Sequence, residues 1–421
     1  TQATFKLGIS FENWKDGNDK YMHPFGTTGT DHWSAGFQHF WLKDRERGSK
    51  VVYGDYCLES AAARQGKFAH LPKQGLNYAF HTDATLFAGF LREFSKKLGV
   101  DRVEGKIKEI KMHPETGFIE SLDMESGRVV EGDLFIDCTG FRGLLIEQTL
   151  KTGYEDWTHW LPCDRAVALQ TDSVIEPIPY TRAIAHHAGW QWRIPLQHRV
   201  GNGLVFCSQY MSDDEATLHL IKNIVGELRG TPRVINFTTG RRKKNWNKNV
   251  VALGLSSGFV EPLESTSIHL IQQGIIRLMQ LFPHHGIRQA DIDEYNRLSR
   301  IEFEYVRDFL VLHYRQTERD DSPFWRHCQN LPVSDHLKRK ISLYEANGRI
   351  LREKDELFTE DSWLAVMHGQ GLVPKGHHPV VTALGNDEVH RRMEQVRNVI
   401  LASAEHMPSH EDFIRENCSA A

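Results

Sequence analysis

The sequence predicts a mixed α/β (α+β) protein with two sheet regions followed by a mainly helical C-terminal part. Residues 82–140 indicate a helix and then a β-meander, because helical spacing gives way to short strand-like runs joined by PETG and ESG turns. Residues 164–240 are again strand-prone and predict a second sheet, whereas the charged pattern of residues 290–421 is helical. A chain of 421 residues is too long to fold around one small core, so we expect two modules, 1–288 and 289–421.

The composition indicates an ordinary protein that binds small molecules. Hydrophobic residues make up 40% and charged residues 25%, and the formal net charge of -4 gives no basic surface for nucleic acid. No apolar run approaches the length of a membrane span, and no signal peptide opens the chain. The six cysteines form no CxxC, so neither a disulfide framework nor a zinc knuckle is indicated. We expect a cytoplasmic protein with a small-molecule partner and no nucleic-acid or membrane partner.

The amino-terminal segment predicts a strand with two different faces. In FKLGISF, from Phe5 to Phe11, the apolar residues alternate, so Lys6 takes the opposite face. A lone lysine on a strand is usually solvated. The run YMHPFGTTGTDHW, residues 21–33, is rich in glycine and aromatic rings, which predicts a loop that lines a binding site.

Three features of the predicted sheets bear on function. The strand that runs into Asp137–Gly140 resembles the strand end of a flavin-binding oxidoreductase, where a small turn lets the backbone approach the cofactor; an ordinary turn is the alternative. Trp190 and Trp192 alternate on a strand-like run, so their rings face the same side, either as an aromatic wall or as sheet packing. The GNG sequence at 201–203 predicts a hairpin turn.

The stretch FVEPLESTSIHLIQQGIIRLMQLFP, residues 259–283, predicts a proline-fixed turn followed by an amphipathic helix. The face that packs inward is predicted to consist of the apolar residues at helical spacing, Ile268, Ile271, Ile275, Leu278 and Phe282. Ser265, Thr266 and Ser267 are suitable N-cap types, and the first turn of a helix can hold an anion. Glu264 stands directly before them, and a capped core helix is the alternative interpretation.

Several common motifs are excluded. Gly254–Gly258 matches GxSxG but is no nucleophile elbow, because Pro262 follows and the helical period begins only at Ile268. Adjacent histidines such as His186 and His187 cannot share one helical face, so we predict no metal site. Neither a GxxxxGK[ST] loop nor a GxGxxG turn occurs in the sequence.

Taken together, five segments resemble the flavin-dependent halogenases of the tryptophan halogenase family. They occur in a matching order and spacing: FKLGISFENW, HPFG, DCTGFRG, WQWRIP and GFVEPLESTSI. FLVLHYRQTERDDSPFW and DELFTEDSW also look like this family. The resemblance implies a box-like FAD module related to aromatic hydroxylases, followed by a helical substrate module. It implies too that the GxGxxG unit, the βαβ start of the FAD module, belongs ahead of Thr1 and is absent from these residues.

The activity implied by the resemblance is halogenation of an indole-like or other electron-rich aromatic. A separate flavin reductase supplies FADH2, which with O2 and chloride or bromide yields hypohalous acid. Lys6 matches the catalytic lysine, which either becomes a haloamine or hydrogen-bonds and polarises hypohalous acid. Glu264 matches the essential glutamate beside the substrate, where a carboxylate can help to remove the ring proton. Thr266 and Ser267 match positions that bind halide through backbone amides.

The resemblance assigns the remaining site residues to three groups. Four residues match positions that contact the cofactor: Val103, Gly140, Leu255 and Ile268. His23 and Phe25 match the histidine and the ring that stack on the substrate. Trp190 and Trp192 would stand between flavin and substrate.

Two other functions and several details stay open. An aromatic hydroxylase of related fold would form product without halide, and a flavin-less remnant would only bind aromatic compounds. Free-tryptophan halogenases grip the amino-acid backbone with a tyrosine-rich segment, which RILREKDELFTEDSWLAVMHGQG does not match. The substrate, the position of halogenation, the preferred halide and a homodimer are therefore left undetermined.

Overall fold

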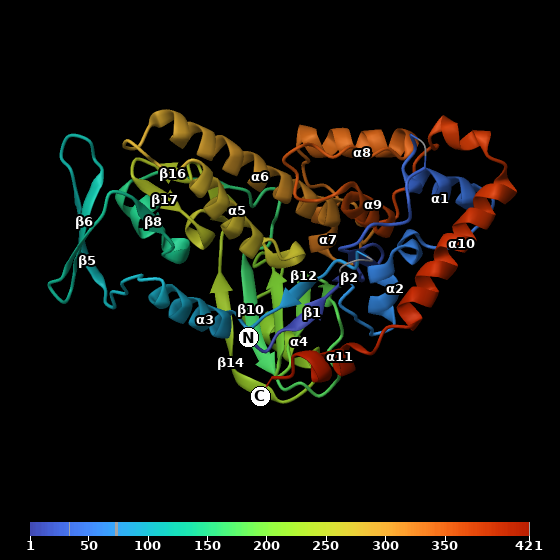
Figure 1. The fold of residues 1–421 in the computed structure, drawn as a ribbon, viewed down its shortest axis with the longest axis horizontal. Helices are drawn as coiled ribbons and strands as arrows, with labels where there is room; N and C mark the ends of the chain where they lie inside the picture. The colour runs from blue at the N-terminus through green and yellow to red at the C-terminus, as the bar shows by residue number, and fades with distance from the viewer. Residues whose placement is uncertain (33, 72–74, 421) are drawn as a thin grey trace. The chain divides into compact units, whose positions relative to one another are not determined.

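The computed structural model describes residues 1–32, 34–71 and 75–420. It contains helices and five separate sheets, which confirms the mixed α/β class (Figure 1). No helix among the described residues has the length and apolar character needed to cross a membrane.

Two compact units interleave along the chain. The first comprises residues 1–88, 165–236 and 308–421, and the second comprises residues 89–164 and 237–307. The helices α3 and α6 run from one unit into the other. The predicted sequential division into modules 1–288 and 289–421 therefore does not follow these units, and it stays a prediction about function.

The first unit is built on a seven-stranded sheet with the strand order β14-β10-β13-β12-β11-β2-β3. Its strands are β2 (Gly8–Glu12), β3 (Lys20–Pro24), β10 (Arg165–Thr171), β11 (Thr181–His186), β12 (Gly189–Pro195), β13 (Val200–Phe206) and β14 (Leu228–Asn236). All neighbours are antiparallel except β2 and β11, which are parallel. A separate antiparallel pair joins β1 (Thr4–Lys6) to β4 (Ala79–His81), so the chain passes from one sheet to another at Leu7.

The first unit also contains helices, some of which contact this sheet. They are α1 (Phe37–Glu46), α2 (Leu58–Arg64), α4 (Asp213–Lys222), the end of α6 (Gln289–Arg315), α7 (Pro323–Cys328), α8 (Asp335–Asn347), α9 (Glu360–Gly369), α10 (Asn386–Glu405) and α11 (His410–Asn417). The long helix α10 packs against α1 and α2, as the red and blue ribbons of Figure 1 show. The helical character predicted for residues 290–421 is confirmed.

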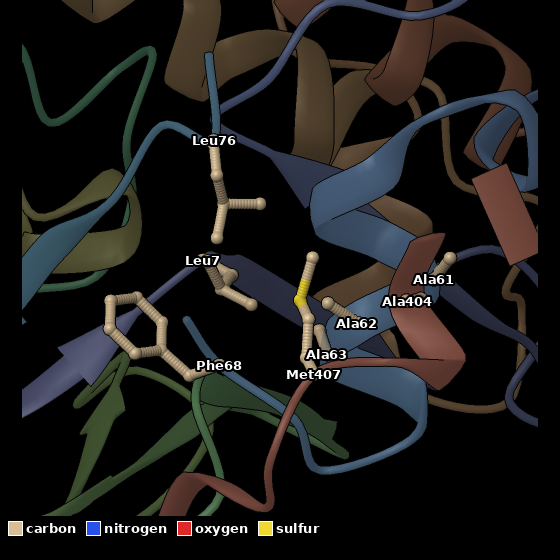
Figure 2. Close-up of a cluster of buried hydrophobic side chains, with 8 residues drawn as sticks. All are labelled: Leu7, Ala61, Ala62, Ala63, Phe68, Leu76, Ala404 and Met407. Atoms are coloured by element: carbon tan, nitrogen blue, oxygen red, sulfur yellow. The ribbon is translucent and has the colours of Figure 1, made fainter. Parts of the chain in front are cut away.

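A buried apolar cluster holds the junction of β1 and β2 (Figure 2). Leu7 is fully buried there with Phe68, Leu76, three alanines of α2, Ala404 of α10 and Met407 just after that helix. Burying a side chain of leucine size stabilises a fold by about 1.5–3 kcal/mol. Because the cluster fixes Leu7, it also fixes its neighbours on both strands.

A buried ion network joins α6, α8 and the segment before α9. The Nδ1 atom of His336 lies 2.9 Å from Oδ2 of Asp308, and its Nε2 atom lies 2.8 Å from Oε1 of Glu356. Lys340 Nζ lies 2.8 Å from the same Glu356 oxygen and donates to the Leu351 carbonyl at 2.7 Å. The network therefore holds the backbone after α8 against α8 itself.

His336, Glu353 and Glu356 also lie close enough together to hold a metal ion. The buried Lys340 ammonium already pairs with Glu356, and a protonated His336 bridges Glu356 and Asp308. Buried carboxylates need such partners to offset their desolvation. We therefore interpret the cluster as a structural ion network.

The second unit contains three small sheets. The meander β5 (Ile107–Met112), β6 (Ile119–Met124), β7 (Val129–Glu131) follows α3 (Ala84–Lys97), as predicted. The sheet β16-β17-β8 contains Trp246–Asn247, Val250–Ala252 and Phe135–Asp137, with β8 parallel to β17. The third sheet, β18-β15-β9, contains Gly258–Phe259, Gly240–Arg242 and Tyr154–Asp156. Helix α5 (Ser267–Gln280) and the first part of α6 complete this unit.

The predicted hairpin turn at residues 201–203 is wrong. These residues lie inside β13, and the turn comes earlier, where the Leu196 N–H donates to the Arg199 carbonyl at 2.9 Å. Gly203 serves side-chain packing instead, because a Cβ there would lie 2.0 Å from the Trp192 ring.

The predicted loop at residues 21–33 is wrong in its first part. Tyr21–Pro24 belong to β3, which pairs with β2, and only the residues after Pro24 leave the strand. Trp33, the last residue of that predicted loop, lies outside the described residues. The pairing of residues 21–24 with β2 leaves no signal in the local sequence, so the glycines and aromatic rings alone led to the wrong prediction of a loop.

The predicted buried face of α5 is also mostly wrong. Ile268, Ile275 and Phe282 are exposed by 58%, 45% and 58%, and Ile271 is half-buried. Of the predicted face only Leu278 is buried, together with Gly274. Gly274 allows close packing, because a Cβ there would lie 2.6 Å from Leu253 Cδ2. A helix with apolar residues on two sides does not reveal from its own period which side is covered.

The Asp137 side chain holds the turn at the end of β8. Its fully buried carboxylate accepts hydrogen bonds from the backbone N–H groups of Thr139 at 2.9 Å, Leu145 at 2.8 Å and Ile146 at 2.9 Å. The Thr139 hydroxyl donates to it as well, at 2.6 Å. One carboxylate thus fixes both the strand end and the start of the following helical turn.

Replacing Asp137 with Ala is expected to lower the free energy of unfolding by roughly 3 kcal/mol, because buried N–H groups lose a charged acceptor. Thermal and urea unfolding of the variant measure this loss. The matched control is Asp133→Ala, because Asp133 is an exposed aspartate just before β8. Equal stability of the two variants would contradict the role given to Asp137.

The His336 network predicts a pH-dependent contribution to stability. Burial by itself lowers the pKa of His336, but hydrogen bonds to Asp308 and Glu356 raise it above its ordinary value of 6.5. A raised pKa in the folded state gives stability that is complete below pH 6.5 and is lost as pH rises through the raised pKa.

The melting temperature of a His336→Gln variant should therefore lie furthest below that of the unchanged protein at acidic pH, with the gap narrowing above pH 6.5. Melting curves across this range check the expectation. His284→Gln, at an exposed histidine, is the control. A gap that widens with pH would refute the protonated bridge.

Candidate active site

Lys6 is a buried cation at the end of β1. Its exposure is 4%, although a lysine on a strand is usually solvated. The neighbouring Phe5 points the other way and stacks on Phe68 with ring centroids 4.1 Å apart, so alternation turns Lys6 inward. Lys6 Nζ lies 5.2 Å from the centre of the Phe25 ring, a distance suited to a cation–π contact.

The charge of Lys6 also affects His81, which lies on β4. Burial first, and then the Lys6 ammonium, lower the pKa of His81 well below its ordinary value. The His81 ring is held between the hydroxyls of Thr4 at 3.1 Å and Thr181 at 2.9 Å. Lys6 therefore has a neutral histidine on this side.

His23 and Phe25 lie together with Lys6, as the sequence predicted for the substrate side. His23 pairs with Ile9 across β2 and β3, and the Phe25 N–H donates to the Leu7 carbonyl at 2.9 Å. The two rings form an edge contact with centroids 6.2 Å apart. Lys6, which precedes Leu7 in the chain, and Phe25, whose N–H donates to Leu7, thus belong with His23 to one site that is aromatic and cationic.

Two further rings of this site were not assigned from the sequence. Phe309 of α6 and Phe358 before α9 stack with centroids 3.6 Å apart, and they lie 5.6 Å and 6.1 Å from the His23 ring. Both fall in segments noted for family resemblance, FLVLHYRQTERDDSPFW and DELFTEDSW. No spacing in the sequence distinguishes them from core residues, because their role depends on distant chain segments meeting.

Trp190 and Trp192 lie on β12 with ring centroids 6.1 Å apart, so both face the same side as predicted. Trp190 is 1% exposed and contacts Trp14 at 6.4 Å. Trp14 contacts His313 at 6.0 Å, and His313 contacts Phe309 at 5.5 Å. A continuous set of rings therefore connects the tryptophans with the rings beside His23.

The second unit brings together two backbone turns at the carboxyl ends of parallel strands. Gly140 follows β8 with φ +73, and a Cβ there would meet nothing within 4 Å. Leu255 follows β17 in the single turn η4 (Gly254–Ser256), which contacts the turn η2 (Gly140–Arg142). Ligands in α/β sheets bind at the carboxyl ends of strands. The open space at Gly140 fits a cofactor that approaches the backbone closely.

Residues Glu264 to Ile268 form the entry to α5. Pro262–Glu264 make a single turn, Ser265 has φ +58, and the helix begins at Ser267 with Thr266 as its N-cap residue. The predicted helix start is confirmed, but the Thr266 side chain makes no capping hydrogen bond, and its buried Oγ1 has no partner among the described residues. An uncapped first turn suits a small anion.

The predicted cofactor contacts differ in their surroundings. Leu255 and Ile268 are 39% and 58% exposed, and α5 contacts η4, so both apolar side chains are available near the Gly140 turn. Val103 is half-buried in the connection between α3 and β5. Its role as a cofactor contact stays a prediction.

The site residues predicted from the sequence are therefore divided between the two units. Lys6, His23, Phe25, Trp190 and Trp192 belong to the first unit. The predicted halide and cofactor residues, and Glu264, belong to the second. Glu264 is buried, with an exposure of 6%.

A cavity of about 710 Å³ lies in the first unit, with a lining that begins at Thr27, two residues after Phe25. Tyr53 and Asp361 also line it, and the Tyr53 hydroxyl donates to Asp361 at 3.3 Å. Burial, reinforced by nearby carboxylates, raises the pKa of Asp361 to about 6. The cavity is large enough for a bicyclic aromatic compound with a side chain.

Comparison with known proteins identifies the fold and its chemistry. Residues 1–386 match the model of the tryptophan halogenase family. Tryptophan 6-halogenase ThaL of Streptomyces albogriseolus is 33% identical over 416 residues, which cover 90% of this chain and 78% of that protein.

Solved structures agree. Xcc4156, a flavin-dependent halogenase from Xanthomonas campestris, is 52% identical with a TM-score of 0.98, covering 100% of this chain and 85% of that one. BrvH, a flavin-dependent halogenase from Brevundimonas sp. BAL3, is 44% identical with a TM-score of 0.97, covering 99% and 86%. Enzymes of this kind use FADH2, O2 and halide. The resemblance drawn from the sequence is confirmed, and the chain belongs to the tryptophan halogenase family of flavin-dependent halogenases.

Proposed function

We propose that this halogenase modifies an indole-like or other electron-rich aromatic compound, with Lys6 and Glu264 as its catalytic residues. The observation that carries the proposal is the buried Lys6 ammonium, 5.2 Å from the Phe25 ring and next to the rings at His23. A desolvated ammonium interacts strongly with a polar oxidant, and the adjacent aromatic faces can stack an aromatic substrate. The electrophile and its target would thus be held next to one another.

The chemistry that the flavin supplies when bound is the oxidation of halide by O2 to hypohalous acid, with electrons from a separate flavin reductase. Lys6 would hold and polarise the hypohalous acid through a donated N–H. Glu264 would accept the proton that the ring loses when the halogen has added, a role for which a carboxylate is suited. Both groups are buried, so water would compete weakly for either.

The residues of the second unit would serve the halide and the cofactor. The first turn of α5, at Thr266 and Ser267, would bind chloride or bromide through backbone N–H groups, with the unpartnered Thr266 hydroxyl nearby. Gly140, Leu255 and Ile268 would contact FAD, and Val103 would do so at its adenine side. Trp190 and Trp192 would separate flavin from substrate and so favour halogenation over hydroxylation. The cytoplasm, where reductases supply FADH2, is the proposed compartment.

The complete protein, given FAD, a flavin reductase, NADH, O2 and chloride or bromide, is expected to convert indole to a halogenated product detectable by mass spectrometry. Omission of halide should abolish product. An oxygenated product in the absence of halide would favour a hydroxylase instead. The absence of product from a broad panel of aromatics, by a protein that binds FAD, would refute the proposal.

Removal of the Lys6 ammonium is expected to reduce halogenated product by at least about a hundredfold, because the electrophile loses its holding group. Flavin reoxidation, measured by absorbance, should continue at its usual rate. Lys6→Met keeps much of the side-chain volume and guards against a folding defect in Lys6→Ala. Lys338→Ala, at an exposed lysine of α8, is the control. Normal product from Lys6→Met would remove Lys6 from the mechanism.

A further inference from the structure

The cavity that begins at Thr27 is lined by two chemically different groups of side chains. The donor group consists of Gln38, His39, Arg349 and His378. The carboxylate group consists of Asp31, Glu360 and Asp361. All of these residues belong to the first unit. Their hydrogen bonds determine which group is available to a ligand.

Arg349 is half-buried, and its guanidinium has no hydrogen-bond or ion-pair partner among the described residues. The backbone on both sides of it is held in place. Gln38 Nε2 lies 3.5 Å from the Gly348 carbonyl, and Lys340 donates to the Leu351 carbonyl at 2.7 Å. A guanidinium offers five N–H donors in a rigid fork that matches a carboxylate. Arg349 is therefore a positioned donor without an acceptor.

One of the two histidines of the donor group, His378, presents an N–H group as well. His39 Nδ1 accepts a hydrogen bond from the His378 backbone N–H at 3.2 Å, and His378 Nδ1 accepts from the Val380 N–H at 3.2 Å. A ring nitrogen that accepts a hydrogen bond carries no proton, so His378 carries its ring proton on Nε2, whereas His39 Nε2 lies 3.5 Å from the Gln38 side-chain amide nitrogen, which is itself a donor. Burial, and then His378, His377 and Arg349, lower the pKa of His39 to about 4, in agreement with a neutral ring.

The carboxylate group, in contrast, already has donors within the protein. Asp31 accepts from the Phe37 backbone N–H at 2.8 Å, and Glu360 accepts from the Arg352 N–H at 3.2 Å. Asp361 accepts from the Tyr53 hydroxyl at 3.3 Å. These groups still repel negative charge, so the cavity favours a ligand with a single negative charge placed at Arg349.

We propose that Arg349, with the Nε2–H group of His378, binds one carboxylate of the aromatic substrate within the cavity that begins at Thr27. The inference rests on the proposed function and specifies its substrate class as an aromatic monocarboxylate. Arg349 begins RILREKDELF, the segment that lacks the tyrosines expected for gripping free tryptophan. The volume of about 710 Å³ accommodates a ring with a short acidic side chain.

Indole-3-acetate and indole test this proposal, since they share a ring and differ by the carboxylate. Calorimetric titration of the complete protein without flavin gives both dissociation constants. Arg349→Gln should raise the constant for indole-3-acetate about tenfold or more, because a charge-assisted hydrogen bond is lost, and should leave that for indole nearly unchanged. Arg349→Lys should restore part of the affinity. Arg233→Gln, at an exposed arginine of β14, should change neither.

Unchanged binding of indole-3-acetate by Arg349→Gln, at an unchanged melting temperature, would overturn the proposal. Tighter binding of a dicarboxylated indole than of indole-3-acetate would overturn the preference for a single charge. Turnover separates this proposal from the proposed function. Selective loss of indole-3-acetate halogenation in Arg349→Gln, with indole halogenation kept, supports both. If neither the unchanged protein nor Arg349→Gln halogenates an indole, but Arg349→Gln still loses affinity for indole-3-acetate selectively, only the proposed function would be refuted.

Discussion

The burial of the Lys6 ammonium at the passage from β1 to β2 is the constraint around which the first unit is arranged. Leu7 is fully buried in an apolar cluster, so neither strand can rotate to return Lys6 to water. A buried charge is costly unless its surroundings compensate it. The Phe25 ring, fixed by its own backbone hydrogen bond to Leu7, supplies part of this compensation. The same packing that buries the cation therefore also places an aromatic face beside it.

In the second unit, polar backbone groups stay accessible to a ligand while the turns that carry them are held in place. The Asp137 carboxylate accepts hydrogen bonds from backbone N–H groups on both sides of the Gly140 turn and so fixes the turn, while a Cβ at Gly140 would meet nothing within 4 Å. At α5, the N-cap residue Thr266 makes no side-chain cap, which leaves the helix start suited to an anion. Rigidity behind an open backbone is what a flavin and halide site requires.

In the first unit, the cavity lining is likewise held in place, but here by side chains. The His336 network and Lys340 fix the segment after α8, and this segment carries Arg349 into the cavity lining. Nearby carboxylates are satisfied by backbone N–H groups and a tyrosine hydroxyl. Among the charged side chains of the cavity lining that the structure describes, Arg349 is the one without a hydrogen-bond or ion-pair partner, and this is why we propose it as the point of substrate selection.

The sequence by itself determined the fold class, the helical C-terminal part, the meander and the family, because period, turn residues and specific motifs are local properties of the chain. It also brought out Lys6, His23 and Phe25, which the structure places together. Only the tertiary structure decided that Gly203 lies inside a strand, which side of α5 is buried, and that the compact units interleave. Only it revealed that Phe309 and Phe358 stack beside His23 and that Arg349 has no hydrogen-bond or ion-pair partner among the described residues. These features depend on which distant segments meet, and contact between distant segments leaves no period or motif in either one.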